Sequence, residues 1–109
     1  MKIVRNGFIP FKGFTAINLF GILFVRDDSF LDGIAINHEL IHTQQMRELL
    51  YIPFYACYVV EWLVRLVLPG NAYRNISFER EAFTCQTDLS YTGHRKPDAW
   101  VKYMIKYRQ

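Results

Sequence analysis

Two histidines and a glutamate stand at a spacing that suits metal chemistry on one helix. His38-Glu39-Leu40-Ile41-His42 forms an H-E-x-x-H pattern. Residues four apart in an α-helix lie on the same face, so the two imidazoles can point at one metal ion. Glu39 is rotated about a third of a turn away, where it can hydrogen-bond a water on the metal rather than bind the metal itself. The pattern predicts a zinc site with Glu39 as general base. The alternative is two ordinary helix-face histidines beside a solvated glutamate.

The surrounding sequence favours the helix that this chemistry needs. We predict a helix from about Leu31 to about Leu50, with apolar positions throughout and no internal proline. Residues 27–29, Asp-Asp-Ser, supply acceptors and negative charge for its N-terminus. His38 and His42 share a face with Gln45, so we expect the site on the core side of the helix.

A catalytic zinc site usually has three protein ligands and one water, so the histidines need a third partner. Glu79 and Glu81 are the candidates, on a helix predicted from Ser77 to about Leu89. Ala82 and Phe83 place Glu79 on an apolar, inward-facing stripe. Glu81 lies about 200° around the helix, so both glutamates cannot face the metal. A buried acid needs a partner, which favours Glu79 as the ligand and leaves Glu81 as the alternative. A first-turn glutamate stabilised by the helix dipole is the other interpretation of Glu79.

The combination of H-E-x-x-H with a downstream Glu79-Arg80-Glu81-Ala82 helix resembles the gluzincin zinc metallopeptidases. It is most similar to compact members that have little beyond these helices and a small sheet. Gln44-Gln45, after the second histidine, resembles small bacterial proteins of uncharacterised function that carry this core. The resemblance covers roughly half of the chain. It implies one zinc ion bound by the two histidines and Glu79, with Glu39 as the base in peptide-bond hydrolysis.

One position departs from that family. Many gluzincins have an aspartate four residues after the ligand glutamate, where it orients a zinc histidine, and here that position is Phe83. Losing such a partner commonly weakens metal affinity or activity ~10–100-fold. We expect Asp88, Asn75 or a backbone carbonyl to take the role. The alternative function is a zinc-binding structural or interaction domain with weak or no catalysis. The candidates for stabilising an oxyanion are Tyr73, Arg74 and His94.

The rest of the chain predicts an α+β fold. Apolar pairs flank Asn6-Gly7, a strong hairpin signal. The apolar run Phe14–Val25 is divided by Gly21, where we expect a bulge or tight bend. We predict a small antiparallel sheet of two to four strands, packed on the helical core of a single zincin-like domain, residues 1–109. The sheet edge can offer pairing to an extended peptide or can simply cover the helix. A short final helix is expected from about Pro97.

The segment Leu49–Leu68 is open to two interpretations. It reads LLYIPFYACYVVEWLVRLVL, close to the ~20 apolar residues that span a bilayer. Pro53 suits the first turn of a helix, and Glu61 and Arg65 have the spacing of a surface ion pair. Two charges are costly in hydrocarbon, so we predict a buried or half-buried helix. The alternative is an interfacial helix or membrane anchor, with Tyr51, Tyr55, Tyr58 and Trp62 at the headgroup level.

Composition limits the remaining function classes. Hydrophobic residues make up 51% and aromatic residues 17%, which excludes general disorder. The net charge of +3, from 13 basic and 10 acidic residues, comes without a nucleic-acid motif, so we expect a peptide or protein substrate and no nucleic acid. Cys57 and Cys85 lie outside any C-x-x-C pattern and are expected to be buried free thiols. Met1–Gly7 lacks the apolar run of a signal peptide, so we expect a cytoplasmic protein, with membrane association through residues 49–68 as the alternative.

Overall fold

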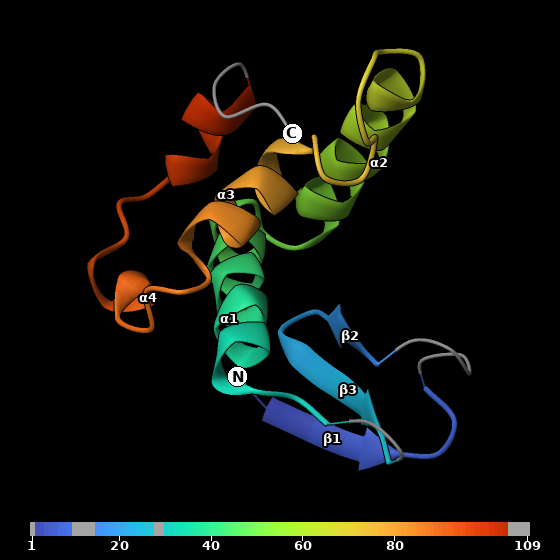
Figure 1. Cartoon of the computed structure of the whole chain (residues 1–109), viewed down its shortest axis with the longest axis vertical. Coiled ribbons are helices and arrows are strands. Elements are labelled where there is room, and N and C mark those ends of the chain that lie inside the picture. Colours follow the sequence, from blue (N-terminus) through green and yellow to red (C-terminus); the bar gives the residue numbers. More distant parts are fainter. Residues whose placement is uncertain (1, 10–14, 28–29, 105–109) are drawn as a thin grey trace.

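The computed structural model describes residues 2–9, 15–27 and 30–104, and it has the predicted α+β fold. Helices α1 and α3 lie at the centre, and the sheet and α2 extend from them (Figure 1). The elements are β1 (Lys2–Asn6), β2 (Ala16–Leu19), β3 (Ile22–Arg26), α1 (Gly33–Glu48), α2 (Ile52–Leu66), α3 (Ser77–Cys85), α4 (Tyr91–His94) and the 3₁₀ helix η1 (Ala99–Met104).

The sheet is mixed, in the order β1-β3-β2, so the prediction of an antiparallel sheet is wrong for one pair. Strands β2 and β3 are antiparallel and joined by a tight turn at Phe20 and Gly21, both with positive φ, as Gly21 indicated. Strand β1 instead runs parallel to β3. The reason lies at Asn6, whose Oδ1 accepts the backbone N–H groups of Phe8 (2.8 Å) and Ile9 (2.6 Å). This side-chain turn leads the chain away from β1 rather than back along it.

The sheet is fixed to α1 through its central and edge strands. Leu23 and Val25, alternate residues of β3, are completely buried. In β2, Asn18 Nδ2 donates to the backbone carbonyl of Glu39 (3.1 Å) and to Thr43 Oγ1 (3.0 Å). The edge strand therefore lies along α1 beside the H-E-x-x-H pattern.

Helix α1 is capped by Asp32, whose Oδ1 accepts the Ala35 N–H at 2.7 Å. The predicted cap at 27–29 is wrong for Asp27, which precedes the helix by several residues, and residues 28 and 29 lie outside the described part. The predicted 31–50 helix is two residues shorter at each end. Among its described residues, five of the seven that are buried are polar, and buried polar groups need partners. The seven are Asn37, His38, Ile41, His42, Thr43, Gln45 and Met46.

Helices α1 and α2 meet at a strained joint. Leu50 (φ 58°) and Tyr51 (φ 66°, ψ −70°) are both non-glycine residues with positive φ. The Ile52 N–H donates to the Leu50 carbonyl at 2.8 Å, so Tyr51 is the centre of the rare positive-φ form of γ-turn. The Tyr51 N–H in turn donates to the Met46 carbonyl at 2.8 Å. The two helices are bent by 112°, and α2 starts with Pro53 in its first turn, as predicted.

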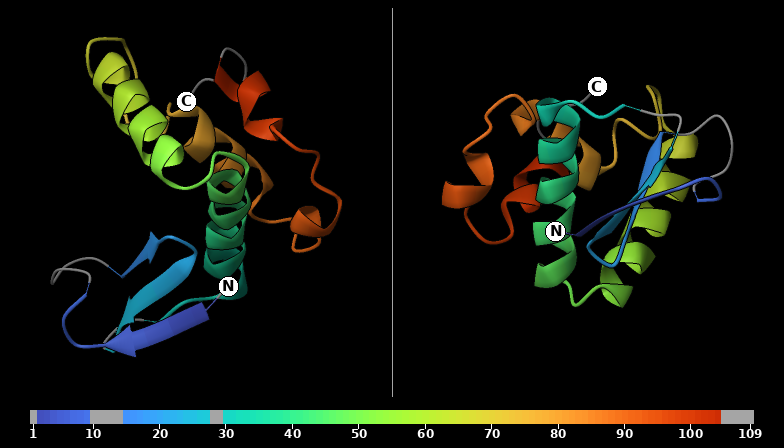
Figure 2. Two further views of the ribbon diagram at one scale, coloured as in Figure 1. Left: turned by 180° about the vertical axis from the view of Figure 1, so that it is seen from behind. Right: turned by 90° about the horizontal axis from the view of Figure 1, so that it is seen from below.

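Helix α2 is not the core helix that the sequence predicted. Among its described residues Phe54 alone is buried, and the helix projects from the body of the molecule (Figure 2). The predicted Glu61–Arg65 pair is also wrong, because each side chain has another partner. Glu61 accepts the backbone N–H (3.0 Å) and hydroxyl (2.6 Å) of Ser77, and Arg65 Nη2 donates to the Met104 carbonyl (2.8 Å). Within the described residues, no individual helix is long and apolar enough to cross a membrane, although α1 and α2 pass that test as a bent pair.

Helix α3 takes the central place instead. Its residues 77–82 are all buried, and it ends at Cys85 rather than near Leu89. Ile76, rather than Ser77, is its N-cap. Cys85 and Cys57 are free thiols, as predicted, but the prediction that they are buried is wrong, because Cys57 is exposed and Cys85 is half-buried. The main apolar core lies where α3 meets α1 and α2, and consists of Met46, Phe54, Ile76 and Phe78.

Candidate metal centre

Three buried side chains from α1 and α3 converge on one point. His38 Nε2 and His42 Nε2 each lie 3.0 Å from Glu79 Oε1, and the two nitrogens are 3.1 Å apart. Donor atoms around a tetrahedral ion at ~2.0–2.1 Å are about 3.3 Å apart, so each donor needs to move outward by only a few tenths of an ångström. The group can therefore hold a metal ion. These are the three residues that we predicted as metal ligands from the sequence.

The two glutamates of α3 have different partners. Glu81 is completely buried and accepts hydrogen bonds from Gln45 Nε2 (2.9 Å), the Tyr91 hydroxyl (2.6 Å) and Arg95 Nη2 (2.9 Å). Arg95 also binds Glu48, with Nη1 at 2.8 Å. Burial opposes the charge on Arg95, but the two carboxylates raise its pKa above the ordinary value. Glu81 thus belongs to an ion-pair network, away from the three metal-binding side chains.

Glutamine amides orient both histidines. His38 Nδ1 lies 2.9 Å from Gln86 Oε1, and His42 Nδ1 lies 2.8 Å from Gln45 Oε1. The oxygen and nitrogen of the Gln45 amide have one possible assignment. Its Nε2 donates to two acceptors, the Phe78 carbonyl (3.0 Å) and the Glu81 carboxylate. An amide oxygen can only accept, so His42 Nδ1 carries a proton and its Nε2 is the atom available to a metal. On His38, Nε2 is likewise the nitrogen that faces Glu79.

These glutamines replace the orienting groups that we expected. Asn75 accepts from buried Arg80 (3.1 Å), and Asp88 binds Ser90 (2.8 Å) and the exposed His94 (3.2 Å). Phe83, which stands where many gluzincins have aspartate, packs edge-on against the His38 ring with centroids 4.5 Å apart. The prediction of Asn75 or Asp88 was wrong because helix α3 ends before Asp88, and Asn75 lies on the Arg80 side.

The sequence contained a signal for each glutamine. Gln45 follows His42 by three residues, so it shares the same helix face. Gln86 follows Glu79 by seven residues, close to two helical turns, and therefore lies on the Glu79 side of α3. Asn37 fixes this end of the helix by donating from Nδ2 to the Gln86 carbonyl (2.8 Å). Sequence reasoning missed Gln45 and Gln86, and it also missed Tyr58. Tyr58 comes from α2, and nothing in the sequence near it indicates that it contacts Glu79.

Glu79 uses its two oxygens for different partners. Oε1 faces the histidines, and Oε2 accepts a 2.6 Å hydrogen bond from the Tyr58 hydroxyl. Burial opposes the charge on Glu79, but His42 and His38 hold the pKa of this carboxyl well below its usual range. Burial likewise opposes a charge on His42, yet Glu79 raises its pKa to about 9. A proton on His42 and a metal ion therefore compete for the same donors.

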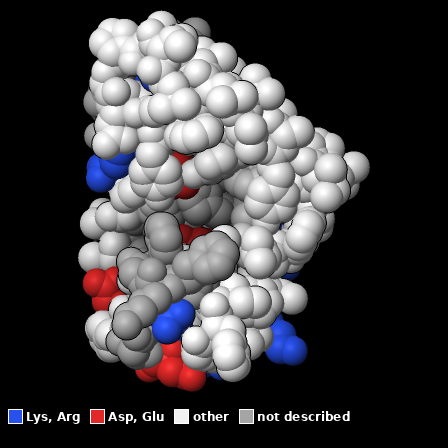
Figure 3. Space-filling model, turned by 90° about the vertical axis from the view of Figure 1, so that its right-hand side faces the viewer, with Lys and Arg blue, Asp and Glu red and all other residues white. Residues whose placement is uncertain are grey.

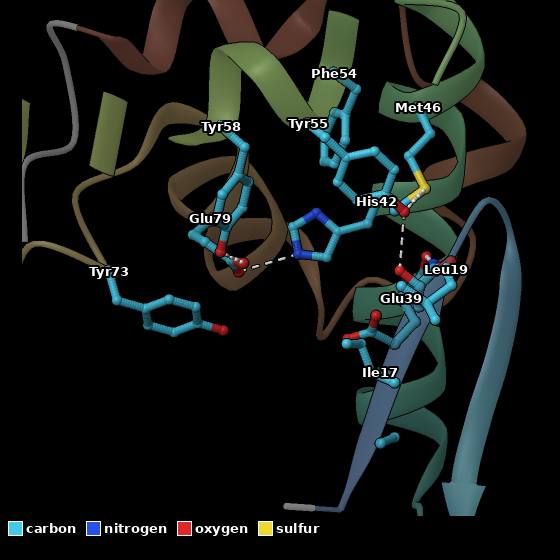
Figure 4. Close-up of a pocket in the computed structure, with 12 residues that line it drawn as sticks. Ile17, Leu19, Glu39, His42, Met46, Phe54, Tyr55, Tyr58, Tyr73 and Glu79 are labelled. Carbon is cyan, nitrogen blue, oxygen red and sulfur yellow. Dashed lines mark hydrogen bonds and ion pairs between the residues drawn. The ribbon is translucent and has the colours of Figure 1, made fainter. Parts of the chain in front are cut away.

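The centre opens into a cavity of about 290 Å³ between β2, α1 and α2 (Figure 4). Glu39 and Tyr73 point into it from opposite sides, with His42 and Glu79 between them. The Tyr55 hydroxyl donates to the Asn18 carbonyl (3.2 Å) and so ties α2 to β2 above the cavity. Apolar side chains complete the lining: Ile17, Leu19, Met46 and Phe54.

A second hollow of about 390 Å³ lies on the other side of Glu39 and is lined partly by His38 and Phe83. Glu39 and Ala16 line both hollows, so the two hollows lie next to each other beside the centre. Figure 3 looks into this side of the molecule, where carboxylate oxygens lie deep in a recess below a nearly uncharged upper surface.

Of the three oxyanion candidates, the structure places Tyr73 at the cavity. Burial, together with the negative charges of Glu79 and Glu39, raises the pKa of Tyr73, so its hydroxyl keeps its proton and can donate it in a hydrogen bond. Arg74 instead lies over the Phe83 ring, 3.8 Å from its centroid, and His94 is paired with Asp88.

No protein-family model, curated protein or solved structure matches this chain. The case for its function therefore comes from the geometry and chemistry of the centre itself.

Proposed function

We propose that the chain is a zinc-dependent peptidase of the gluzincin type. The observation that carries the proposal is the convergence of His38, His42 and Glu79 within 3.1 Å, next to a cavity that Glu39 lines. Two imidazoles and one carboxylate are a common donor set for catalytic zinc, and they leave a fourth position for water or substrate. Harder ions such as magnesium prefer oxygen ligands, which makes zinc the better fit.

Zinc bound there supplies a Lewis acid for the attacking water and the peptide carbonyl. Glu39 accepts the proton of that water as its oxygen bonds to the carbonyl carbon. The same carboxyl then gives the proton to the amine as the carbon–nitrogen bond breaks. Tyr73 donates a hydrogen bond to the carbonyl oxygen as negative charge develops on it.

An extended peptide suits the edge of β2 beside the cavity. Strand β2 is an edge strand and lines the cavity along Ala16–Leu19. Edge strands can pair through their backbone with an extended chain. The apolar lining by Met46 and Phe54 favours an apolar side chain next to the cleaved bond.

The decisive experiment is Glu39→Gln, with zinc content and peptide cleavage measured on the same preparation. We expect one zinc per chain, as in the native protein, and a rate at least ~100-fold lower on a peptide that the native protein cleaves. Asp98→Asn is the matched control, because it makes the same carboxylate-to-amide change in an exposed residue. A Glu39→Gln rate equal to that of the control would refute the proposed base.

The second candidate is a zinc-binding interaction domain without hydrolysis. The glutamine partners of His38 and His42 favour it, because a neutral amide makes an imidazole less basic than a carboxylate does. Zinc stoichiometry on native protein, His38→Ala and Glu79→Ala tests the metal site by itself. One zinc that both substitutions remove, with no cleavage across a peptide library, would select this candidate.

A further inference from the structure

The outer half of α2 carries a large apolar surface that is exposed to solvent. Its side chains range from 41% exposed at Trp62 to 82% exposed at Val67. We call this set the α2 surface. It consists of Val59, Val60, Trp62, Leu63, Val64, Leu66, Val67 and Leu68.

The charges of α2 point away from this surface. Glu61 and Arg65 are the charged residues of the segment 56–68, and they bind Ser77 and Met104 on the body of the protein. At 100° per residue, the helical members of the α2 surface, Val59 to Leu66, cover an arc of about 200° around the helix, and the two charges lie in the remainder. Figure 3 shows the corresponding upper region almost free of charged atoms.

The width of that arc distinguishes between two kinds of partner, another protein chain and the lipid of a membrane. A helix that packs against another protein buries a stripe about 100° wide or somewhat wider. A second copy of this chain, lying along α2, would leave much of a surface about 200° wide in water. Lipid tails can surround a projecting helix on every side except the one that joins it to the protein. The helical residues 59–66 are about 12 Å long, less than half of a ~30 Å hydrocarbon layer.

We propose that the α2 surface inserts into one leaflet of a lipid bilayer and holds the protein at the membrane. The turn after the helix is compatible with this position, since Asn71 Oδ1 accepts the Arg74 N–H (3.0 Å) and the Asn71 carbonyl accepts the Asn75 N–H (3.0 Å). Polar groups bonded within the chain are less costly near hydrocarbon. This inference does not depend on the peptidase proposal, and its test involves no catalysis.

The test is flotation of the full-length protein with phosphatidylcholine vesicles at low and high salt. Because the contact is apolar, we expect binding to uncharged lipid that 0.5 M salt does not remove, whereas a purely electrostatic contact would be lost. The variant Leu63→Asp/Val67→Asp should bind at least about tenfold more weakly. The matched control is Phe8→Asp/Leu89→Asp, which also replaces two exposed apolar residues by aspartate, at positions outside α2 that are 87% and 65% exposed.

A second measurement locates the helix. Trp62 and Trp100 are the two tryptophans, so Trp100→Phe leaves Trp62 as the reporter. We expect phospholipids with brominated acyl chains to quench its fluorescence. A native chain that stays out of the lipid fraction, equal binding by the two double variants, or unquenched Trp62 would each overturn the proposal. A native dimer that Leu63→Asp/Val67→Asp converts to a monomer, without lipid binding, would assign the α2 surface to a second copy.

Discussion

Zinc affinity should rise steeply with pH, far above the range in which an ordinary histidine titrates. His42 must lose a proton before Nε2 can bind a metal, and Glu79 raises the pKa of His42 from 6.5 to about 9. Below pH 9, each unit of pH should therefore change the apparent affinity about tenfold, or ~1.4 kcal/mol. Between pH 6.5 and 9 the total gain is about 300-fold, since 9 − 6.5 is 2.5 units.

The assay is competition for zinc against a chromophoric chelator whose own pH dependence is known, from pH 6.5 to 9.5. Glu79→Gln is the control, because it keeps the shape of the side chain and removes the charge. Without that charge, burial lowers the pKa of His42, so we expect weaker binding and a nearly flat pH profile above 6.5. A flat profile for the native protein, or the same slope in both proteins, would refute the proposed competition between proton and metal.

Three further outcomes follow from the same contacts. Gln45→Leu removes the acceptor of His42 Nδ1 and should weaken zinc binding ~10–100-fold in the chelator assay; an unchanged affinity would contradict the orienting role. Arg95→Met leaves Glu81 buried without its cation and should lower the free energy of unfolding by about 3–5 kcal/mol in urea, whereas exposed Lys96→Met should change it by less than ~0.5 kcal/mol. The metal-free protein should also lose stability in alkali. The raised pKa of His42 stabilises the fold fully below pH 6.5, and this contribution disappears as pH rises through about 9. Urea unfolding in the presence of chelator, at pH 6.5 and at pH 9.5, measures this loss of stability. Equal unfolding midpoints at the two pH values would contradict the stabilising role of protonated His42.

The positions of the three candidate metal ligands were predictable because most of their geometry is local. His38 and His42 lie on one helix, where spacing alone fixes their relative direction. Glu79 was selected from the inward face of its own helix, and the structure places it 3.0 Å from both nitrogens. Glu81, which the rotation argument left open as the alternative ligand, lies instead in the Arg95 network.

The features that were missed depend on contacts between distant segments. The parallel pairing of β1 follows from the Asn6 side-chain turn, which competes with the hairpin that Asn-Gly usually forms. Tyr58 reaches Glu79 from another helix. The apolar composition of α2 suits a buried helix and an exposed one equally well, and the partners of Glu61 and Arg65 determine which side of it faces water.

The γ-turn at Tyr51 affects both the cavity and the α2 surface. It sets the direction of α2, whose inner side supplies Phe54, Tyr55 and Tyr58 to the cavity and whose outer side is the α2 surface. A backbone conformation of this kind costs about 1–3 kcal/mol and persists because the packing around it compensates. The direction of α2 therefore depends on this packing. Because the same helix carries residues of the cavity on one side and the α2 surface on the other, a change of its angle would alter the shape of the cavity and the position of the α2 surface together.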